Sequence, residues 1–393
     1  MKLTDATIKF IKKHQDDDPS KLALQAKKYP DVDMPFAITQ IVGRKIAMEK
    51  IPSWGNTDGL IYPRHLSLEQ CSSEATARYK SSLVRADILI DMTGGFGIDC
   101  AFLSANFQRA VYVERQQELC EIAFSNFPLL GLQHIDVVNG DGVEYLSRVE
   151  KVDWLFIDPA RRNEQGGKVV AIADCEPNVG EISELLVNKA QQVMIKLSPM
   201  LDLSLALHDL SFAREVHVVS VANECKELLV ILRKEEKSAE MPVHCVNILK
   251  NGEMQTYSFN KEEEQQGCEY AKQVGRFLYE PNASILKAGA YKSIANSYQF
   301  KKLHPNSHLY TSDQLIVNFP GRKFECEAVF SLNKKELKTN MENIKQANIT
   351  VRNFPSSVAE LRKRLKLSDG GDNYLFATTL MDEQKVLIKC HKS

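Results

Sequence analysis

The strongest chemical signal in the sequence is a glycine-rich turn that follows an apolar segment. Residues 88–91 (Ile-Leu-Ile-Asp) run into Met-Thr-Gly-Gly-Phe-Gly at 92–97, and helix-forming residues come next. Glycines allow a tight turn and a close approach of the backbone to a ligand, and a helix N-terminus offers unpaired N–H groups and a positive dipole end. The motif therefore predicts a ligand-binding turn. Its candidate residues are Asp91, Thr93, Gly94, Gly95, Gly97 and Asp99.

A second acidic residue, Glu114, ends the next apolar segment, 23 residues after Asp91. An ionised carboxylate has two acceptor oxygens and can bind both hydroxyl groups of a ribose. The same charge would repel a 2′-phosphate, which argues against NADP as the ligand. We therefore predict that Glu114, with the adjacent Arg115, belongs to a cofactor site.

A third motif, Asn-Gly-Asp-Gly at 139–142, follows the third apolar segment. Asp141 is placed to accept a hydrogen bond from an adenine amino group. Gly142 beside it gives the base room to approach. The same residue types also favour an ordinary turn, so a purely structural explanation stays open for this motif.

A fourth motif, Asp-Pro-Ala-Arg-Arg at 158–162, follows the fourth apolar segment. This is the place where open α/β sheets bind ligands, beyond the carboxyl ends of their strands. A carboxylate at Asp158 can take a proton or orient an acceptor, Pro159 fixes the wall of a pocket, and arginines can contact phosphates. We predict Asp158, Pro159 and Arg161 as the catalytic residues.

Short apolar runs separated by helical stretches would carry these residues. Continuous apolar strands spaced by helices are typical of a parallel sheet buried on both faces. The last run follows its predecessor too closely for a crossover helix, so the final strand is expected to be antiparallel. The runs lie at 88–91, 110–114, 135–138, 154–158, 193–197, 216–219 and 228–232. The fold class predicted is therefore α/β, with a Rossmann-like, mostly parallel sheet.

Regions of different character flank this sheet. The residues before it are expected to form helices. After Glu240, the sequence predicts a β-hairpin with a type I′ turn at Asn251-Gly252. Helices are expected next at 262–277 and 284–298, and the end of the chain mixes strands with a basic helix at 357–367.

The composition is that of an ordinary globular protein, with 44% hydrophobic residues, 26% charged residues and a net charge of −1. No apolar run is long enough to span a membrane, and the start does not resemble a secretory signal. The nine cysteines are scattered without a CxxC pair, which favours reduced thiols over a disulfide frame or a zinc site. We therefore expect a cytoplasmic protein without a metal or a membrane partner.

Charge is unevenly distributed along the chain. Residues 284–393 contain 18 Lys and Arg against 10 Asp and Glu, which gives this part a net charge of +8. A basic region beside an acidic remainder points to a polyanionic partner there, although a solvated basic surface would look the same. The basic residues expected to contact such a partner are Lys287, Lys292, Lys301, Lys302, Arg352, Arg362, Lys363 and Arg364.

The four motifs, in this order over residues 83–234, resemble those of class I S-adenosylmethionine (SAM)-dependent methyltransferases. The resemblance implies that the glycine-rich turn faces the methionine part of SAM and that Asp91 engages its amine. Two departures stand out. Thr93 replaces the first glycine of the usual pattern. Ala160 and Arg161 replace the second proline and the aromatic residue of the (Asp/Asn)-Pro-Pro-(Tyr/Phe) motif, so the chain lacks the side chain that stacks on a target base in that family.

The outer parts of the chain are similar to a bacterial group of methyltransferases with a C-terminal THUMP-like domain. This likeness rests on residues 62–74, 278–289 and 322–389. True THUMP domains belong to tRNA-modifying enzymes, so the resemblance implies an RNA substrate, either tRNA or rRNA. The domains predicted are an N-terminal helical region (1–82), the SAM-dependent methyltransferase domain (83–240), a linking hairpin with a small α/β subdomain (241–321) and an α+β THUMP-like domain (322–393).

Other interpretations stay open at this point. The chain could methylate a protein or a small molecule and use its C-terminal part for dimerisation. It could also be a non-catalytic module that binds SAM or RNA: the altered residues after Pro159 favour this, and the complete set of acidic residues argues against it. An NAD-dependent dehydrogenase is a further alternative, because the same glycine-rich turn binds dinucleotides.

Overall fold

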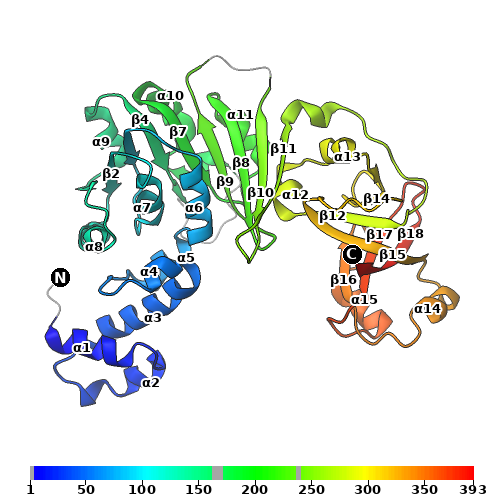
Figure 1. The fold of residues 1–393 in the computed structure, drawn as a ribbon, viewed down its shortest axis with the longest axis horizontal. Helices are drawn as coiled ribbons and strands as arrows, with labels where there is room; N and C mark the ends of the chain where they lie inside the picture. Colours follow the sequence, from blue (N-terminus) through cyan, green and yellow to red (C-terminus); the bar gives the residue numbers. More distant parts are fainter. Residues whose placement is uncertain (1–3, 162–170, 236–239) are drawn as a thin grey trace. The chain divides into compact units, whose positions relative to one another are not determined.

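The computed structural model describes residues 4–161, 171–235 and 240–393 (Figure 1). The chain forms two compact units. The first contains Met1–Arg214 and Lys226–Lys237, and the second contains Glu215–Cys225 and Ser238–Ser393. Among the described residues, no helix combines the length and the apolar character needed to pass through a bilayer.

The first unit begins with a run of helices, as the sequence predicts. They are α1 (Asp5–His14), α2 (Pro19–Leu24), α3 (Met34–Lys50), α4 (Pro52–Gly55), α5 (His65–Gln70) and α6 (Glu74–Ser82). The long helix α3 packs against α1, α2, α4 and α5. The buried side chains of the outermost helices are Phe10, Leu22, Met34, Ala37 and Ile41. This small apolar core explains why short helices persist here, since helices of this length are marginal without tertiary packing.

A mostly parallel sheet forms the centre of the first unit (Figure 1). The strands of this sheet that lie in the first unit are β1 (Ile88–Asp91), β2 (Arg109–Glu114), β3 (Ile135–Asn139), β4 (Val152–Ile157), β7 (Ala190–Leu197) and β9 (Glu224–Leu232), in the order β9-β7-β4-β1-β2-β3. All of these neighbours pair in parallel except β7 and β9, which are antiparallel. The predicted Rossmann-like fold with an antiparallel last strand is thus confirmed.

Helices connect the parallel strands of this sheet. They are α7 (Ile98–Ser104), α8 (Gln117–Leu129), α9 (Gly142–Arg148) and α10 (Val179–Lys189), and a further helix, α11 (Leu203–Asp209), follows β7. Beyond β4, the short strand β5 (Ala160–Arg161) pairs with β6 (Cys175–Glu176) and forms a small antiparallel ribbon, and a 3₁₀ turn, Ile172–Asp174, precedes β6. This ribbon follows the Asp-Pro motif directly.

The second unit begins with β8 (Ala213–Val221), β10 (Pro242–Ile248) and β11 (Met254–Asn260). β8 and β10 are parallel, and β10 and β11 form the predicted antiparallel hairpin. Its turn differs from the predicted type I′. Among the described loop residues, Gly252 has a positive φ (+87°) and Asn251 does not, and the N–H of Gly252 bonds to the carbonyl of Leu249. A type I turn followed by a left-handed glycine fits the hairpin equally well.

A second, mostly antiparallel sheet forms the rest of this unit. Its strands are β12 (Phe277–Pro281), β13 (Lys301–Lys302), β14 (Tyr310–Ser312), β15 (Gly321–Phe330), β16 (Asn348–Arg352), β17 (Tyr374–Thr379) and β18 (Lys385–Lys392), in the order β13-β14-β12-β15-β18-β17-β16. The accompanying helices are α12 (Ala283–Ala288), α13 (Ser293–Ser297), α14 (Lys334–Asn340) and α15 (Val358–Leu365). β15, β17, β18 and α15 match elements expected from the sequence.

The predicted helix at 262–277 is wrong. The structure has a short 3₁₀ turn there, Lys261–Gln265, capped by Asn260 and Glu263, and the chain then continues irregularly. The acidic run Glu262–Glu264 suits a helix start, but Gly267 and Gly275 follow within the same stretch. Glycine is costly in a helix interior, which explains why the turn does not extend.

Candidate active site

The carboxyl ends of the parallel strands bring the predicted acidic residues to one edge of the sheet. Asp91 is the last residue of β1 and Glu114 is the last residue of β2. Asp141 follows β3 as the N-cap residue of α9, and Asp158 follows β4 directly. Open α/β sheets bind their ligands at this edge. The four motifs therefore occupy one candidate site.

The glycines of the turn between β1 and α7 are needed for two different reasons. A Cβ on Gly94 would lie 2.2 Å from the ring of Tyr112, which is fully buried. Gly95 and Gly97 have φ angles of +54° and +87°, which side chains rarely adopt. A Cβ on Gly95 would come within 4 Å of only one described atom, the carbonyl oxygen of Thr93. The backbone around Gly95 is therefore open on the side where a ligand would approach.

The carboxylate of Asp91 is buried, and only one of its two oxygens accepts a hydrogen bond from the described residues. Its side chain is 1% exposed, and Oδ1 accepts a hydrogen bond from the N–H of Thr93 at 3.0 Å. Oδ2 is buried and has no hydrogen-bond partner in the described part of the chain. Burial raises the pKa of Asp91 well above its usual range, and the nearby carboxylates of Asp99, Asp158 and Glu114 raise it further. Such a group is poised to accept a hydrogen bond from a cation.

Glu114 ties the glycine-rich turn to the end of β2. One carboxylate oxygen accepts from the N–H of Gly95 at 2.8 Å, and the other accepts from the N–H of Gln116 at 2.8 Å. Each oxygen has a second lone pair, so the carboxylate can still accept from a ligand hydroxyl. The two backbone contacts fix its orientation.

Asp141 and Arg115 form an ion pair beside this group. Arg115 Nε donates to Asp141 at 2.7 Å, and another of its nitrogens contacts Glu176 at 2.6 Å. Asp141 also caps α9 by accepting from the N–H of Glu144 at 2.8 Å. Burial opposes ionisation of Asp141, but these donors outweigh it and lower the pKa. Asp141 thus has a structural role as cap, and its predicted contact with an adenine amino group stays a prediction.

Gly142 is required by packing against the glycine-rich turn. A Cβ at this position would lie 2.3 Å from the carbonyl oxygen of Met92. The first turn of α9 therefore sits directly against the residue that follows Asp91. This contact accounts for the glycine without reference to a ligand.

Thr93 links the first and fourth motifs. Its hydroxyl oxygen accepts a hydrogen bond from the N–H of Asp158 at 2.7 Å. A glycine, which the family pattern has at this position, could not make the contact. The carboxylate of Asp158 is 39% exposed and forms an ion pair with Lys196, near the end of β7. Thr93 and Lys196 therefore hold the backbone and the side chain of Asp158, respectively.

Behind Asp158 lies a buried network of charged side chains. Lys196 also contacts Asp99 at 3.4 Å, and Asp99 contacts Lys80 at 3.1 Å. Lys80 is fully buried and donates to both oxygens of Glu227, at 2.6 and 2.7 Å. Burial disfavours the charged forms, but the two carboxylates beside Lys196 raise its pKa, and the two lysines lower the pKa of Asp99.

The sequence predicts Asp99 as a cofactor residue, and the predicted residues do not include Lys80, Lys196 and Glu227. The hydroxyl of Ser72 donates to Oδ2 of Asp99 at 2.7 Å, whereas Oδ1 accepts no hydrogen bond from the described residues and lies 3.1 Å from Nζ of Lys80. The predicted contact of Asp99 with the cofactor stays a prediction. The signal that could have revealed Lys196 is a lysine inside an otherwise apolar strand, since an unpaired charge is too costly to bury. Lys80 and Glu227 lie 147 residues apart, and no local pattern connects them.

The remaining candidates surround Asp158. Pro159 is partly buried, and the backbone of Arg161 belongs to β5. The side chain of Arg161 and the whole of Arg162 lie outside the described residues. The catalytic role predicted for Arg161 therefore stays a prediction.

Comparison with known structures shows a close relationship to a solved protein. A protein from Porphyromonas gingivalis W83, to which methyltransferase activity is ascribed, is 36% identical over 100% of both chains, with a TM-score of 0.89. Residues 277–320 match a family described as a ferredoxin-like domain, and residues 321–392 match a family described as THUMP domain-like. A search among curated proteins found no match.

Two more distant structures are similar over the first part of the chain. TrmK from M. capricolum, in complex with S-adenosylhomocysteine, is 15% identical over 42% of this chain and 69% of its own, with a TM-score of 0.33. An rRNA methylase from Streptococcus thermophilus is 13% identical over 41% of this chain and 95% of its own, with a TM-score of 0.30. Both likenesses are too weak to carry an argument. From the full-length match and the C-terminal domains, the chain belongs to the family of class I methyltransferases that end in a THUMP-like domain.

Proposed function

We propose that this protein transfers the methyl group of SAM to RNA. The proposal rests on one observation. The buried carboxylate of Asp91, at the carboxyl end of β1, has one oxygen without a hydrogen-bond partner among the described residues, and it lies beside the glycine-rich turn, whose backbone is open around Gly95. The methionine part of SAM carries an ammonium group, which needs an anionic partner shielded from water. Asp91 Oδ2 fits that requirement. Glu114 and Asp141, at the ends of the neighbouring strands, suit the ribose and the adenine.

The acceptor side is built around Asp158. SAM supplies an electrophilic methyl group, so the protein must align the acceptor and exclude water rather than form a covalent intermediate. A carboxylate at Asp158 can take the proton that the acceptor loses. Lys196 contacts this carboxylate and Thr93 holds the backbone N–H of the same residue, so both parts of Asp158 are positioned for an acceptor. Pro159 forms the adjacent wall.

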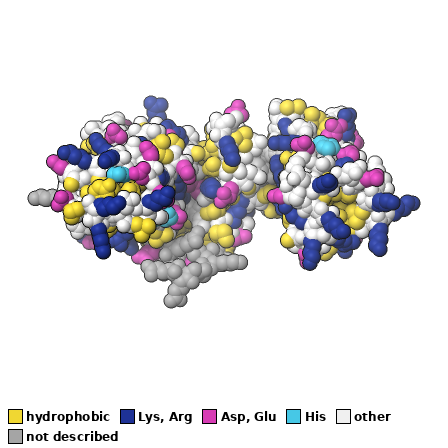
Figure 2. Space-filling view, turned by 90° about the horizontal axis from the view of Figure 1, so that it is seen from below, with side chains coloured by type: hydrophobic (Ala, Val, Ile, Leu, Met, Phe, Trp, Pro, Cys, Tyr) yellow, Lys and Arg dark blue, Asp and Glu magenta, His cyan; other side chains and the backbone are white. Residues whose placement is uncertain are grey.

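The basic part of the second unit supports RNA as the acceptor. Lys and Arg side chains recur over the C-terminal part of the surface in Figure 2. One of the predicted contacts needs correction. Lys302 is 2% exposed and donates to the carbonyl of Pro305, so it cannot reach an RNA. Arg352 is 38% exposed and forms an ion pair with Glu280 at 2.8 Å, so its contact with RNA stays a prediction. Lys363 and Arg364, on α15, are exposed and are the stronger candidates for phosphate contacts.

The test is methyl transfer from tritiated-methyl SAM with the purified full chain. The acceptors are total RNA and protein extract from cells that lack the protein, followed by separate digestion with ribonuclease and protease. The Asp158→Asn variant keeps the shape of the side chain and removes its charge. Asp136→Asn is the matched control, because Asp136 is an exposed carboxylate on β3, paired only with exposed Arg109 in the described residues.

The proposal is supported if ribonuclease releases the label, if Asp158→Asn abolishes the labelling and if Asp136→Asn leaves it unchanged. Transfer to RNA should also fall steeply with salt, because phosphate contacts release counterions. If protease releases the label and ribonuclease does not, the methyl acceptor is a protein. SAM binding without any labelled product would indicate a small-molecule acceptor or a non-catalytic module.

A further inference from the structure

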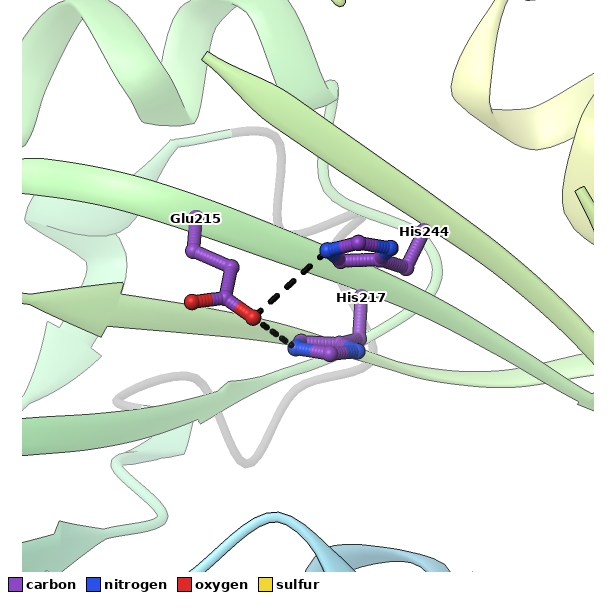
Figure 3. Close-up of side chains that lie close together, drawn as sticks. All are labelled: Glu215, His217 and His244. Atoms are coloured by element: carbon purple, nitrogen blue, oxygen red, sulfur yellow. Dashed lines mark hydrogen bonds and ion pairs between the residues drawn. The ribbon is translucent and has the colours of Figure 1, made fainter. Parts of the chain in front are cut away.

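Three side chains that can bind a metal ion lie together on β8 and β10, within the second unit. Glu215 and His217 are two residues apart on β8, so they point to the same face of the sheet. His244, on β10, is the residue directly opposite His217 in the parallel pairing. The three side chains converge on one point of that face, as Figure 3 shows. The cluster takes no part in the proposed methyl transfer.

The donor atoms of the cluster are close enough to share one ion. Nε2 of His217 lies 3.0 Å from Oε1 of Glu215, and Nε2 of His244 lies 3.6 Å from the same oxygen. Donor atoms around a four-coordinate zinc ion are about 3.3 Å apart, given metal–ligand bonds of about 2.0–2.1 Å. One ligand atom from each residue lies within 4.8 Å of the others. The rings stack at 28°, so the partly exposed ring of His244 must tilt for its lone pair to converge with that of His217.

A second layer of contacts and partial exposure complete the arrangement. Nδ1 of His244 lies 2.8 Å from the hydroxyl of Ser258, which is paired with it on β11. Metal-binding histidines usually bond through their other ring nitrogen in this way, which fixes the ring and the tautomer. The side chain of His217 is 5% exposed, whereas those of Glu215 and His244 are 22% and 32% exposed. An ion can therefore enter from solvent and keep a water ligand.

We propose that Glu215, His217 and His244 form a binding site for one divalent transition-metal ion, of the kind that prefers imidazole nitrogen, such as Zn²⁺. Two imidazoles and one carboxylate are a common ligand set for such ions, with at least one coordination position left to solvent. The ion would connect β8 to β10 through their side chains. No CxxC or His-rich spacing marks the site in the sequence, because the third ligand comes from a neighbouring strand.

The site can be tested with Co²⁺ as a spectroscopic probe of zinc binding. The full chain is treated with a chelator, kept reduced and titrated with Co²⁺ while the visible spectrum is recorded; Zn²⁺ is then added as a competitor. The proposal predicts one Co²⁺ per chain, with the visible bands of a four- or five-coordinate ion and no thiolate-to-cobalt charge-transfer band. The last feature separates this site from the nine free cysteines.

Four variants assign the ion to these residues. Ser258→Ala should weaken Co²⁺ binding by about 10- to 100-fold, and His244→Ala should weaken it further. Glu215→Gln keeps the side-chain shape, so it decides the matter if His244→Ala fails to fold. The matched control is His208→Ala. This histidine is 85% exposed and pairs with Asp209, and its loss should change nothing.

Thermal melts with and without metal provide a second measurement. A bound ion stabilises the native chain according to its affinity, so Zn²⁺ should raise the melting temperature of the wild type and of His208→Ala but not of Glu215→Gln. The proposal is overturned if the wild type binds Co²⁺ no more tightly than Glu215→Gln. A spectrum that contains only thiolate-bound cobalt would overturn it as well.

Discussion

The pH dependence of cofactor binding offers the sharpest test of the site, through the substitution Asp91→Asn. The buried carboxyl of Asp91 has a pKa well above its usual range, because burial and neighbouring carboxylates disfavour its ionised form. An ammonium group binds only the ionised form, so binding must release a proton. Below this raised pKa, the affinity for SAM should therefore increase up to about tenfold for each pH unit.

The magnitude for Asp91→Asn follows from the contacts of the carboxylate. Asparagine is the same size and can still accept from the N–H of Thr93, but it removes the charge offered at Oδ2. A hydrogen bond to a charged group contributes about 1.5–3 kcal/mol, which corresponds to a loss of affinity of about 10- to 150-fold. The variant should bind with an affinity that no longer changes with pH.

The same substitution should not destabilise the cofactor-free protein. A carboxyl whose pKa is raised on folding binds more protons in the native state than in the unfolded state. The free energy of unfolding therefore falls as the pH rises from the ordinary pKa of an aspartate to the raised one. Asp91→Asn removes this fall, so at neutral pH the variant should melt at the same temperature as the wild type or higher.

Calorimetric titration with SAM and with S-adenosylhomocysteine, between about pH 5.5 and 8.5, measures the affinity and the proton release together. Both ligands carry the amine, and only SAM carries the sulfonium, so a pH dependence common to both identifies the amine as the partner of Asp91. Asp136→Asn, at an exposed carboxylate, serves as the control. Affinity that is independent of pH in the wild type, or unchanged by Asp91→Asn, would refute the reasoning.

Three further outcomes are expected. Asp158→Asn removes one of the charges that raise the pKa of Asp91, so S-adenosylhomocysteine binding should extend to lower pH. Methyl transfer by this variant should fall by about 100- to 10,000-fold, and unchanged turnover would exclude Asp158 as the base. Lys196→Met removes one of the two cations that contact the buried carboxylate of Asp99, so it should lower the free energy of unfolding by about 3–5 kcal/mol in urea titrations. A loss under about 1 kcal/mol would contradict the network. Gly94→Ala places a Cβ 2.2 Å from a buried aromatic ring and should cost about 1–3 kcal/mol, while Gly140→Ala, with no described atom within 4 Å, should cost little.

The sheet could be predicted because its determinants are local. Apolar runs such as 110–113 have no charged face, and their regular spacing by helical stretches leaves few alternatives to a parallel sheet. The carboxyl-end acidic residues follow from the same logic, since parallel strands end at one edge. Asp91, Glu114 and Asp158 therefore lie where the sequence predicts them.

What could not be predicted depends on contacts between distant segments. The pairing of Lys80 with Glu227 requires that α6 and β9 meet, which no local pattern reveals. The juxtaposition of His217 and His244 depends on the register of β8 and β10: a shift by one residue would send the side chains to opposite faces. The substitution of Thr93 for glycine could only be explained once its hydroxyl was seen to hold Asp158.

The buried charged side chains at the carboxyl edge of the sheet are better explained by the binding of a cation than by a contribution to folding stability. Replacing buried ion pairs by apolar residues is often neutral or stabilising, so their presence alone argues little about folding.

The network contains three acidic and two basic side chains: Asp99, Asp158, Glu227, Lys80 and Lys196. When all five are ionised, one negative charge is left over, and every member except Asp158 is largely buried. The carboxylates of Asp99 and Asp158 raise the pKa of Asp91 for the same reason that they would attract a sulfonium and an ammonium. Burial is the largest cause of the raised pKa of Asp91, and the neighbouring carboxylates raise this pKa further. The negative charge that favours proton uptake by Asp91 without ligand would thus also favour the binding of a cation.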